Sequence, residues 1–184
     1  AKKIAHQNFH QNIDSEHIFL SILQNNKSIK KILELNKLNL KAVEEIILRK
    51  IKNKGKMKNK QNTLFIGDTL HKVFKKANDI KIKSREVVIS TEHILIGLTY
   101  DDSVGNYIYN KKTIPEFIEL LHKMNKNNPL DQLGIRREHI IAVKQAYTHT
   151  NKQTSMNRAK YLWEIIQIFK RYDSYRDGLY WEEE

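Results

Sequence analysis

An internal repeat constrains this chain more than any other feature of its sequence. The stretch IDSEHIFLSIL, residues 13–23, returns 76 positions later as ISTEHILIGLT, residues 89–99. The match covers a Glu-His pair and the apolar residues that follow it. Repetition at this distance indicates two copies of one supersecondary unit, because each copy must bury its apolar face against something.

Each copy begins as a helix would. Ser15 and Thr91 are suited to the N-cap, where a side-chain oxygen accepts from the free N–H groups of the first turn. Glu16 and Glu92 follow, where a negative charge suits the positive end of the helix dipole. Apolar residues then recur at helical spacing. We therefore expect two amphipathic helices with Ser15 and Thr91 as helix caps.

The segments around the two copies extend the unit. A helical pattern precedes each copy, and the chain is expected to begin partway through the first of these helices. Residues 32–51 resemble residues 130–147, with Asn36 and Gly134 at equivalent places. Both residue types tolerate the left-handed conformation that ends a helix, so each is expected to be a C-cap before the last helix of its unit.

The second copy is longer than the first by 22 residues between the Glu and the C-cap. Thr113 and Glu116 form a capping-box pattern in this extra stretch, which predicts an inserted helix. A third EHI at residues 138–140 follows two arginines rather than a capping hydroxyl, so we interpret it as coincidence.

We expect an all-α fold: a pseudo-twofold, duplicated four-helix repeat of about eight helices. The predicted segments are repeat one (1–52), a linker (53–66), repeat two (67–150) with an inserted helix (109–129), and a helical C-terminal extension or connector (151–184). The Lys-rich stretch 50–62 fits a solvated linker better than an anion-binding strip.

Composition excludes several classes of function. The chain has no Cys, which removes thiolate zinc sites, cysteine catalysis and disulfides. No apolar run approaches the length of a membrane span, so we expect no membrane partner. The formal charge of +12 raises the alternative of a basic helical nucleic-acid-binding domain. Only 7 of the 33 basic residues are Arg, which favours a solvated basic surface instead.

The Glu-His pairs do not fit a catalytic or metal site. A zinc protease places two His at i and i+4, whereas adjacent residues point about 100 degrees apart on a helix. We expect His17 and His93 to be structural, packed in the first turn with a ring nitrogen bonded to backbone. Glu16 and Glu92 are expected to be exposed, which makes them the better contact candidates. We predict no catalytic residue and no metal ligand; a helical hydrolase or metal protein remains the third hypothesis.

These paired motifs resemble the amino-terminal domain of the Clp AAA+ unfoldases, the ClpA, ClpB and ClpC group, over roughly residues 1–150. His10 matches a common family His, and the second copy holds Glu86 there, with Arg85 where a Gly is usual. The resemblance implies a domain that docks unfolded or tagged polypeptides, or an adaptor protein, and passes them to a hexameric ATP-driven ring. A Clp protease is a further partner that it implies.

The resemblance also suggests site residues. In ClpC-like members the Glu of each pair belongs to a site for the guanidinium of phosphorylated arginine, which points to Glu16 and Glu92. A hydroxyl at the start of the preceding helix assists; by register Gly67 falls at that position, and Thr69 lies two residues away. The chain has no phosphate-binding P-loop, so we expect no cofactor here; ATP and Mg belong to the parent protein's AAA+ modules. Lys and Asn richness with such a domain would fit an organelle of an AT-rich eukaryote, such as a plastid.

Overall fold

The computed structural model describes residues 1–35, 38–108, 159 and 162–167. The chain divides into two compact units, residues 1–34 with 38–109 and residues 35–37 with 110–184. The predicted insertion at 109–129, the C-caps Asn36 and Gly134, and the third EHI lie outside the described residues.

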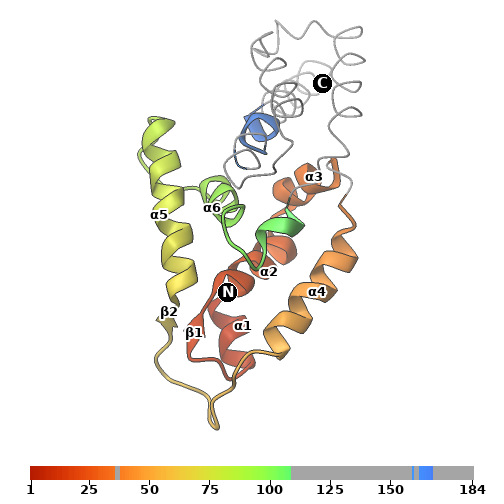
Figure 1. Ribbon diagram of the computed structural model, residues 1–184, viewed down its shortest axis with the longest axis vertical. Coiled ribbons are helices and arrows are strands. Elements are labelled where there is room, and N and C mark those ends of the chain that lie inside the picture. Colours follow the sequence, from red (N-terminus) through yellow and green to blue (C-terminus); the bar gives the residue numbers. More distant parts are fainter. Residues whose placement is uncertain (36–37, 109–158, 160–161, 168–184) are drawn as a thin grey trace, which may run out of the picture. The chain divides into compact units, whose positions relative to one another are not determined.

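The first unit is mostly helical, as predicted. Its helices, shown in Figure 1, are α1 (Lys2–Gln7), α2 (Ser15–Asn25), α3 (Lys27–Leu35), α4 (Leu40–Lys52), α5 (Asp68–Lys83), α6 (Thr91–Leu98) and the 3-10 turn η1 (Gly105–Tyr107).

A short parallel strand pair joins the two parts of this unit, and the sequence reading did not foresee it. Strand β1 (Asn12–Ile13) pairs with β2 (Phe65–Ile66), immediately before α2 and α5. Two residues are too few to show the alternation that marks a strand. Gly67 follows β2 because a Cβ there would collide with the carboxylate of Asp14. The predicted linker 53–66 therefore ends in a strand. The pairing of this strand with β1 places the start of α5 beside the start of α2.

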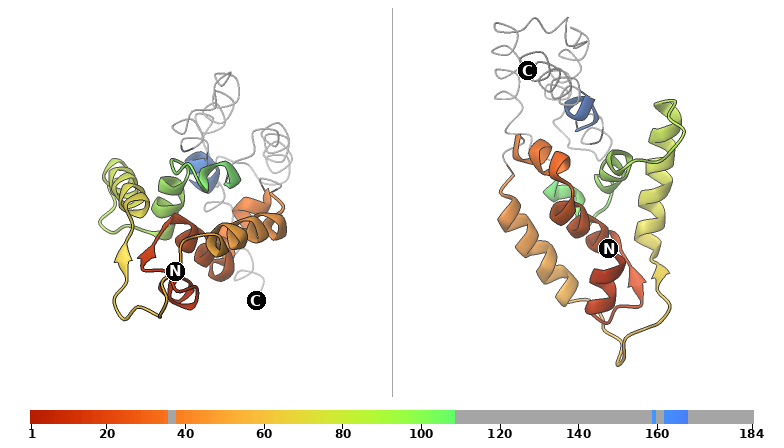
Figure 2. Two further views of the ribbon diagram at one scale, coloured as in Figure 1. Left: turned by 60° about the horizontal axis from the view of Figure 1, so that its bottom comes forward. Right: turned by 180° about the vertical axis from the view of Figure 1, so that it is seen from behind.

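Helix α2 is the centre of the first unit. It packs against α1, α4, α5 and α6, and Figure 2 shows it between α4 and the α5–α6 pair. Its buried apolar side chains are Phe19, Leu20, Ile22 and Leu23. The same spacing in α6 buries Leu95, Ile96 and Leu98. The apolar faces predicted from the repeat are therefore the core of this unit.

Segments that lie 76 residues apart share backbone hydrogen bonds as well as similar sequences. Helix α1 ends with Phe9 in the left-handed region (φ 60°), and α5 ends with Arg85 at φ 58°. In α1 the N–H groups of residues 9 and 10 donate to the carbonyls of residues 6 and 5. In α5 those of residues 85 and 86 donate to residues 82 and 81. Both helices thus stop with the same turn.

The described residues of the second unit, 159 and 162–167, are helical. Leu162, Ile165 and Ile166 are fully buried there and recur at helical spacing, in the segment predicted to be a helical extension. Among the described residues, no helix combines the length and the apolar character needed to cross a bilayer.

Candidate functional site

The two matched helices begin one residue earlier than predicted. Their N-caps are Asp14 and Ser90 rather than Ser15 and Thr91. This shift places His at the third helical position, where a capping box needs a side-chain acceptor for the N-cap N–H. The N–H of Asp14 donates to Nδ1 of His17 at 2.8 Å, and that of Ser90 donates to Nδ1 of His93 at 2.9 Å. In each helix the histidine is therefore the capping-box acceptor, a role that Glu or Gln usually has.

Both histidines are fully buried, and each has a second partner on the preceding turn. Nε2 of His17 lies 2.8 Å from Nδ1 of His10, and Nε2 of His93 lies 3.1 Å from a carboxylate oxygen of Glu86. These partners stand 76 residues apart, so the two motifs share one geometry. Because Nδ1 of His17 accepts from backbone, its Nε2 carries the hydrogen and donates to His10.

This arrangement predicts that stability falls on mild acidification. Burial, followed by the neighbouring His10, lowers the pKa of His17 to about 4. In the unfolded chain a His titrates near its ordinary value of about 6.5. The unfolded state therefore binds more protons between these values, and the stabilisation is complete above 6.5 and lost as pH falls toward 4. We expect about 2 kcal/mol less free energy of unfolding at pH 5 than at pH 7, measured by urea denaturation.

His71 offers a matched control, because it is exposed on α5. We expect the change His71→Gln to leave the pH dependence intact. A free energy of unfolding that is equal at pH 7 and pH 5 would show that the buried His10–His17 pair does not resist protonation.

The start of α2 is also the centre of a polar cluster. Nζ of Lys54 lies 3.2 Å from Asp14 and 3.3 Å from Glu16. The other carboxylate oxygen of Glu16 accepts from the Ser103 hydroxyl at 2.8 Å. The Ser15 hydroxyl donates to Asp101 at 2.8 Å and lies 3.4 Å from Oγ1 of Thr69. We call these residues the Glu16 cluster: Asp14, Ser15, Glu16, Lys54, Thr69, Asp101 and Ser103.

Glu16 and Lys54, at the centre of the cluster, both stay ionised. Burial alone would raise the pKa of Glu16, but the hydrogen bond from Ser103, its own backbone N–H and the Lys54 ammonium outweigh burial and hold that pKa below its ordinary value. Burial would lower the pKa of Lys54, and the charges of Glu16 and Asp14 instead raise it. A buried carboxylate and a half-buried ammonium thus stabilise each other in their ionised forms.

Asp101 ties the segment after α6 to this cluster. One of its carboxylate oxygens accepts from the N–H groups of Ser103 and Val104, at 2.9 and 3.1 Å, and the other accepts from Ser15. The Asp therefore closes its own turn and holds that turn against the start of α2.

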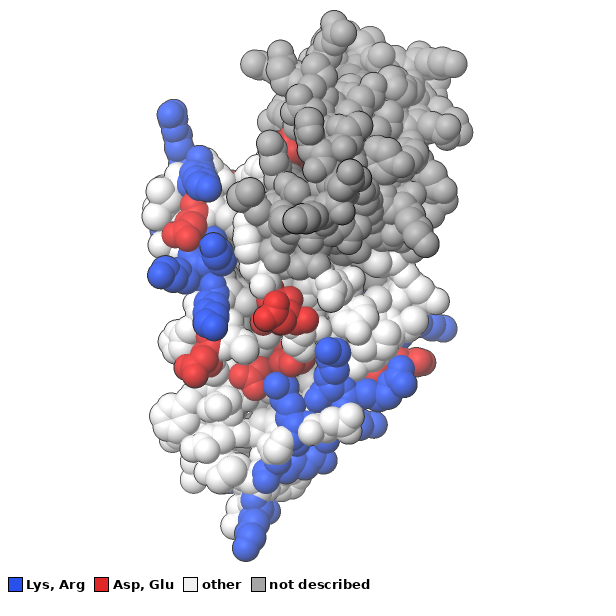
Figure 3. All heavy atoms as spheres, in the orientation of Figure 1, with Lys and Arg blue, Asp and Glu red and all other residues white. Residues whose placement is uncertain are grey.

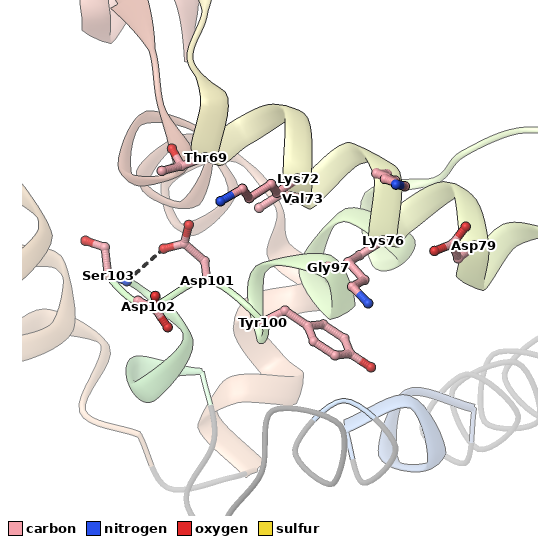
Figure 4. A pocket seen from close by; sticks show the side chains of 11 residues that line it. Thr69, Lys72, Val73, Lys76, Asp79, Gly97, Tyr100, Asp101, Asp102 and Ser103 are labelled. Carbon is pink, nitrogen blue, oxygen red and sulfur yellow. Dashed lines mark hydrogen bonds between the residues drawn. The ribbon is translucent and has the colours of Figure 1, made fainter.

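A groove of about 470 Å³ opens beside the cluster, between α5 and the segment after α6. Figure 4 shows Thr69, Lys72 and Lys76 reaching it from α5, with Tyr100 and Asp101 opposite. Nζ of Lys76 lies 4.8 Å from the centre of the Tyr100 ring, a cation–π contact. Burial raises the pKa of Tyr100, so its phenol stays neutral. The groove therefore offers an apolar wall, cationic side chains and carboxylates together.

The basic residues do not gather into one surface on the face that Figure 3 shows. Lys and Arg side chains lie over α5 and over α4 with the loop that follows it, and acidic side chains lie between these two groups. A nucleic-acid site needs a continuous basic stripe, so this face does not favour that alternative.

The structure separates the predicted contact residues. It brings Glu16 and Thr69 into one cluster, whereas Glu92 is partly exposed at the start of α6. Glu16 is only 6% exposed, so the expectation that it lies open to a ligand is wrong. Its burial follows from its contacts with Lys54 and Ser103, because Glu92 holds the same second helical position in α6 and stays partly exposed.

Sequence reasoning missed four members of the cluster, of which Asp14 is the N-cap that replaces the predicted Ser15. Lys54 could not be told from the other lysines of its loop, and its partners are distant in sequence. Asp101 and Ser103 carry a local signal, because Asp two residues before Ser is typical of a side-chain-closed turn. Among the described residues there is no group of three or more His, Asp or Glu that could hold a metal ion.

Comparison with known families agrees with this geometry. The family model described as the Clp repeat (R) N-terminal domain matches residues 1–112. The chain belongs to this family. The match covers the first unit, with both capped helices, the strand pair and the Glu16 cluster.

The Clp repeat domain here is similar to the start of bacterial ClpB chaperones. It is 33% identical over 110 residues to chaperone protein ClpB of Prochlorococcus marinus, covering 59% of this chain. It is 25% identical over 114 residues to chaperone protein ClpB 2 of Synechocystis sp., covering 62% of this chain. In each case the match covers 13% of the relative's length.

Proposed function

We propose that this Clp repeat domain docks unfolded polypeptides, or an adaptor that carries them, for an ATP-dependent Clp-type unfoldase. The ATP-driven hexameric ring and any Clp protease would be partners of the parent protein. The observation that carries the proposal is the groove between α5 and the segment after α6, which combines an aromatic wall with charges of both signs. Such a surface suits extended polypeptides of varied sequence, because each side-chain class finds a complementary group.

The Glu16 cluster holds the two sides of this groove in place. It links the starts of α2 and α5 to the turn at Asp101, so it fixes the distance between the two walls. In this arrangement Thr69 is the predicted contact residue that faces a ligand, since it lines the groove. A phosphoarginine guanidinium would reach Glu16 only by displacing Lys54, so peptide docking in the groove is the better supported function.

The test is binding of a fluorescein-labelled, permanently unfolded polypeptide, followed by anisotropy. We expect the double change Lys72→Ala and Lys76→Ala to weaken binding about tenfold, because it removes two cations and the contact with Tyr100. The matched control is Lys81→Ala with Lys83→Ala, which removes the same charge from α5 outside the groove.

Equal losses in the two double variants would mean general charge attraction and would rule out groove docking. The same assay with an RNA or DNA probe tests the nucleic-acid alternative, for which affinity should fall steeply with salt. We expect no ATP turnover by these 184 residues.

We also propose that the domain is a duplicated four-helix repeat extending to residue 150, with an inserted helix at 109–129. Support comes from contacts that recur at the 76-residue offset: the turns after α1 and α5, and the paired His10–His17 and Glu86–His93 contacts. These recurring contacts support the duplication, whereas the inserted helix and the extension to residue 150 rest on the sequence pattern.

A further inference from the structure

A small polar pocket lies beside the start of α2, past the C-terminal end of α1. Its volume is about 300 Å³, several times the roughly 30 Å³ that one water molecule occupies. His10 is only 3% exposed and lies at the inner end of the pocket, whereas the exposed residues Gln11, Asn12 and Met57 form its rim. The pocket is therefore larger than a single water site and has a buried histidine at its base.

The ring of His10 carries a hydrogen-bond donor that the protein leaves without an acceptor. Burial, followed by the charge of Lys54, lowers the pKa of His10, so the ring is neutral at pH 7 and carries one hydrogen. Its Nδ1 accepts from His17, so this hydrogen lies on Nε2. Among the described residues Nε2 has no hydrogen-bond partner, although it is buried. A buried donor without an acceptor is unfavourable, and a ligand that brings an acceptor removes this cost.

The second repeat shows that the capping motif itself does not need this donor. Glu86 stands where the first repeat has His10, and its carboxylate lies 3.1 Å from Nε2 of His93. A carboxylate only accepts, so it completes the bond to the histidine and offers no hydrogen to a ligand. The next two positions also differ, because two valines replace Gln11 and Asn12. The donor and the polar rim are thus features of the first repeat that the shared motif does not require.

The charges around the pocket favour a neutral ligand. Asp14 and Lys54 both line it, and they pair with each other at 3.2 Å. Lys54 also pairs with Glu16 at 3.3 Å, so its positive charge is already matched. An anion would be repelled by the Asp14 carboxylate, and a cation by the Lys54 ammonium. A carboxamide is neutral and has both an acceptor and a donor, which is what the pocket can satisfy.

We propose that this pocket binds the carboxamide side chain of a Gln or Asn in a client polypeptide. The carboxamide oxygen accepts from Nε2 of His10, and the NH₂ group donates to the carboxylate of Asp14. The rim side chains are exposed, so they are free to rotate and admit the ligand to the ring.

This site is separate from the groove, because the two share no lining residue. The inference rests on the proposed docking of polypeptides, to which it adds selection for a side chain. A polypeptide that reaches both places would be held by charged and aromatic contacts in the groove and by a carboxamide in the pocket.

The probes are three capped peptides, acetyl-Gly-X-Gly-N-methylamide with Gln, Glu or Met as X, titrated into the ¹⁵N-labelled 184-residue protein at pH 7. For the Gln peptide we expect shifts of the His10 ring nitrogens and of the amides of residues 10–12 and 54–56. The expected Kd is on the order of 1 mM, because the contact involves few atoms. The Glu and Met peptides should bind at least about fivefold more weakly, since neither can both accept from His10 and donate to Asp14.

His10→Glu copies the arrangement of the second repeat, because it keeps an acceptor for His17 and removes the donor to the pocket. We expect this protein to keep a dispersed amide spectrum and to lose the response to the Gln peptide. His71→Glu is the matched control, since His71 is exposed on α5 outside the pocket, and this variant should bind normally. The Lys72→Ala, Lys76→Ala protein should also bind normally, which separates failure of this site from failure of the groove.

Three results would overturn the proposal: equal affinity of the three peptides, shifts confined to groove residues, or unchanged binding by a folded His10→Glu protein. If the His10 ring nitrogens respond to none of the peptides, the pocket holds water only and the proposal is wrong. The peptide series on the parent protein decides the matter even where His10→Glu does not fold.

Discussion

Replacing Glu16 by Ala is expected to lower the free energy of unfolding by about 2–3 kcal/mol. The carboxylate is buried, and its removal leaves Lys54 with one partner and the Ser103 hydroxyl without its acceptor. Breaking a fully buried ion pair costs about 3–5 kcal/mol, and the lower value applies here because Lys54 is 28% exposed and keeps Asp14. Urea denaturation at pH 7 measures the difference.

Glu16→Gln separates the charge from the hydrogen bond. Its amide oxygen can still accept from Ser103, so we expect about half of the loss seen with Ala. The lowered pKa of Glu16 means that its charge stabilises the fold above about pH 4.5 and ceases to do so as pH falls through the folded pKa. The difference between the parent and the Gln variant should therefore shrink in acid.

Glu45→Ala is the matched control, since Glu45 is an exposed acidic residue of α4. Its removal should change stability by less than about 0.5 kcal/mol. If Glu16→Ala is as mild as this control, the cluster does not contribute to folding, and Glu16 is free to act as a ligand-binding residue instead.

The helical elements could be predicted because the same pattern occurs twice, so that a helix expected in one copy is supported by the other. Two windows with the same apolar spacing are stronger evidence than one, and α2 and α6 begin within a residue of the expected positions. The error of one residue at each cap has a physical cause. Hydroxyl preference favoured Ser15 and Thr91, whereas the buried His side chains need the N-cap three residues before them.

The site was less predictable because its contacts join residues distant in sequence. Lys54 follows the end of α4 and reaches Glu16 because α4 packs against α2, and the strand pair that places α5 beside α2 is too short to be seen in the sequence. Asp101 meets Ser15 across 86 positions. Local patterns indicate which side chains are polar, but only packing decides that Glu16 is covered while Thr69 lines the groove.

The change Gly97→Val is expected to destabilise the domain by about 3 kcal/mol or more. Gly97 lies where α6 crosses α5, and a Cβ there would come within 2.6 Å of the Val73 carbonyl oxygen and 3.3 Å of its Cγ1. The obstacle is backbone, which cannot rotate away as a side chain could. The two helices would have to separate, exposing part of the core between them.

Gly97→Ala gives the sharper version of this test, because two effects oppose each other. Within a helix Ala is favoured over Gly by about 1 kcal/mol, so an uncrowded site would be stabilised. We expect the overlap with Val73 to win and leave a net loss of about 1–2 kcal/mol by urea denaturation. Ser21, at the same place in α2, is partly exposed, and Ser21→Ala should stay within about 0.5 kcal/mol. A stabilised Gly97→Ala protein would mean that the two backbones are not in close contact and that the small residue is dispensable.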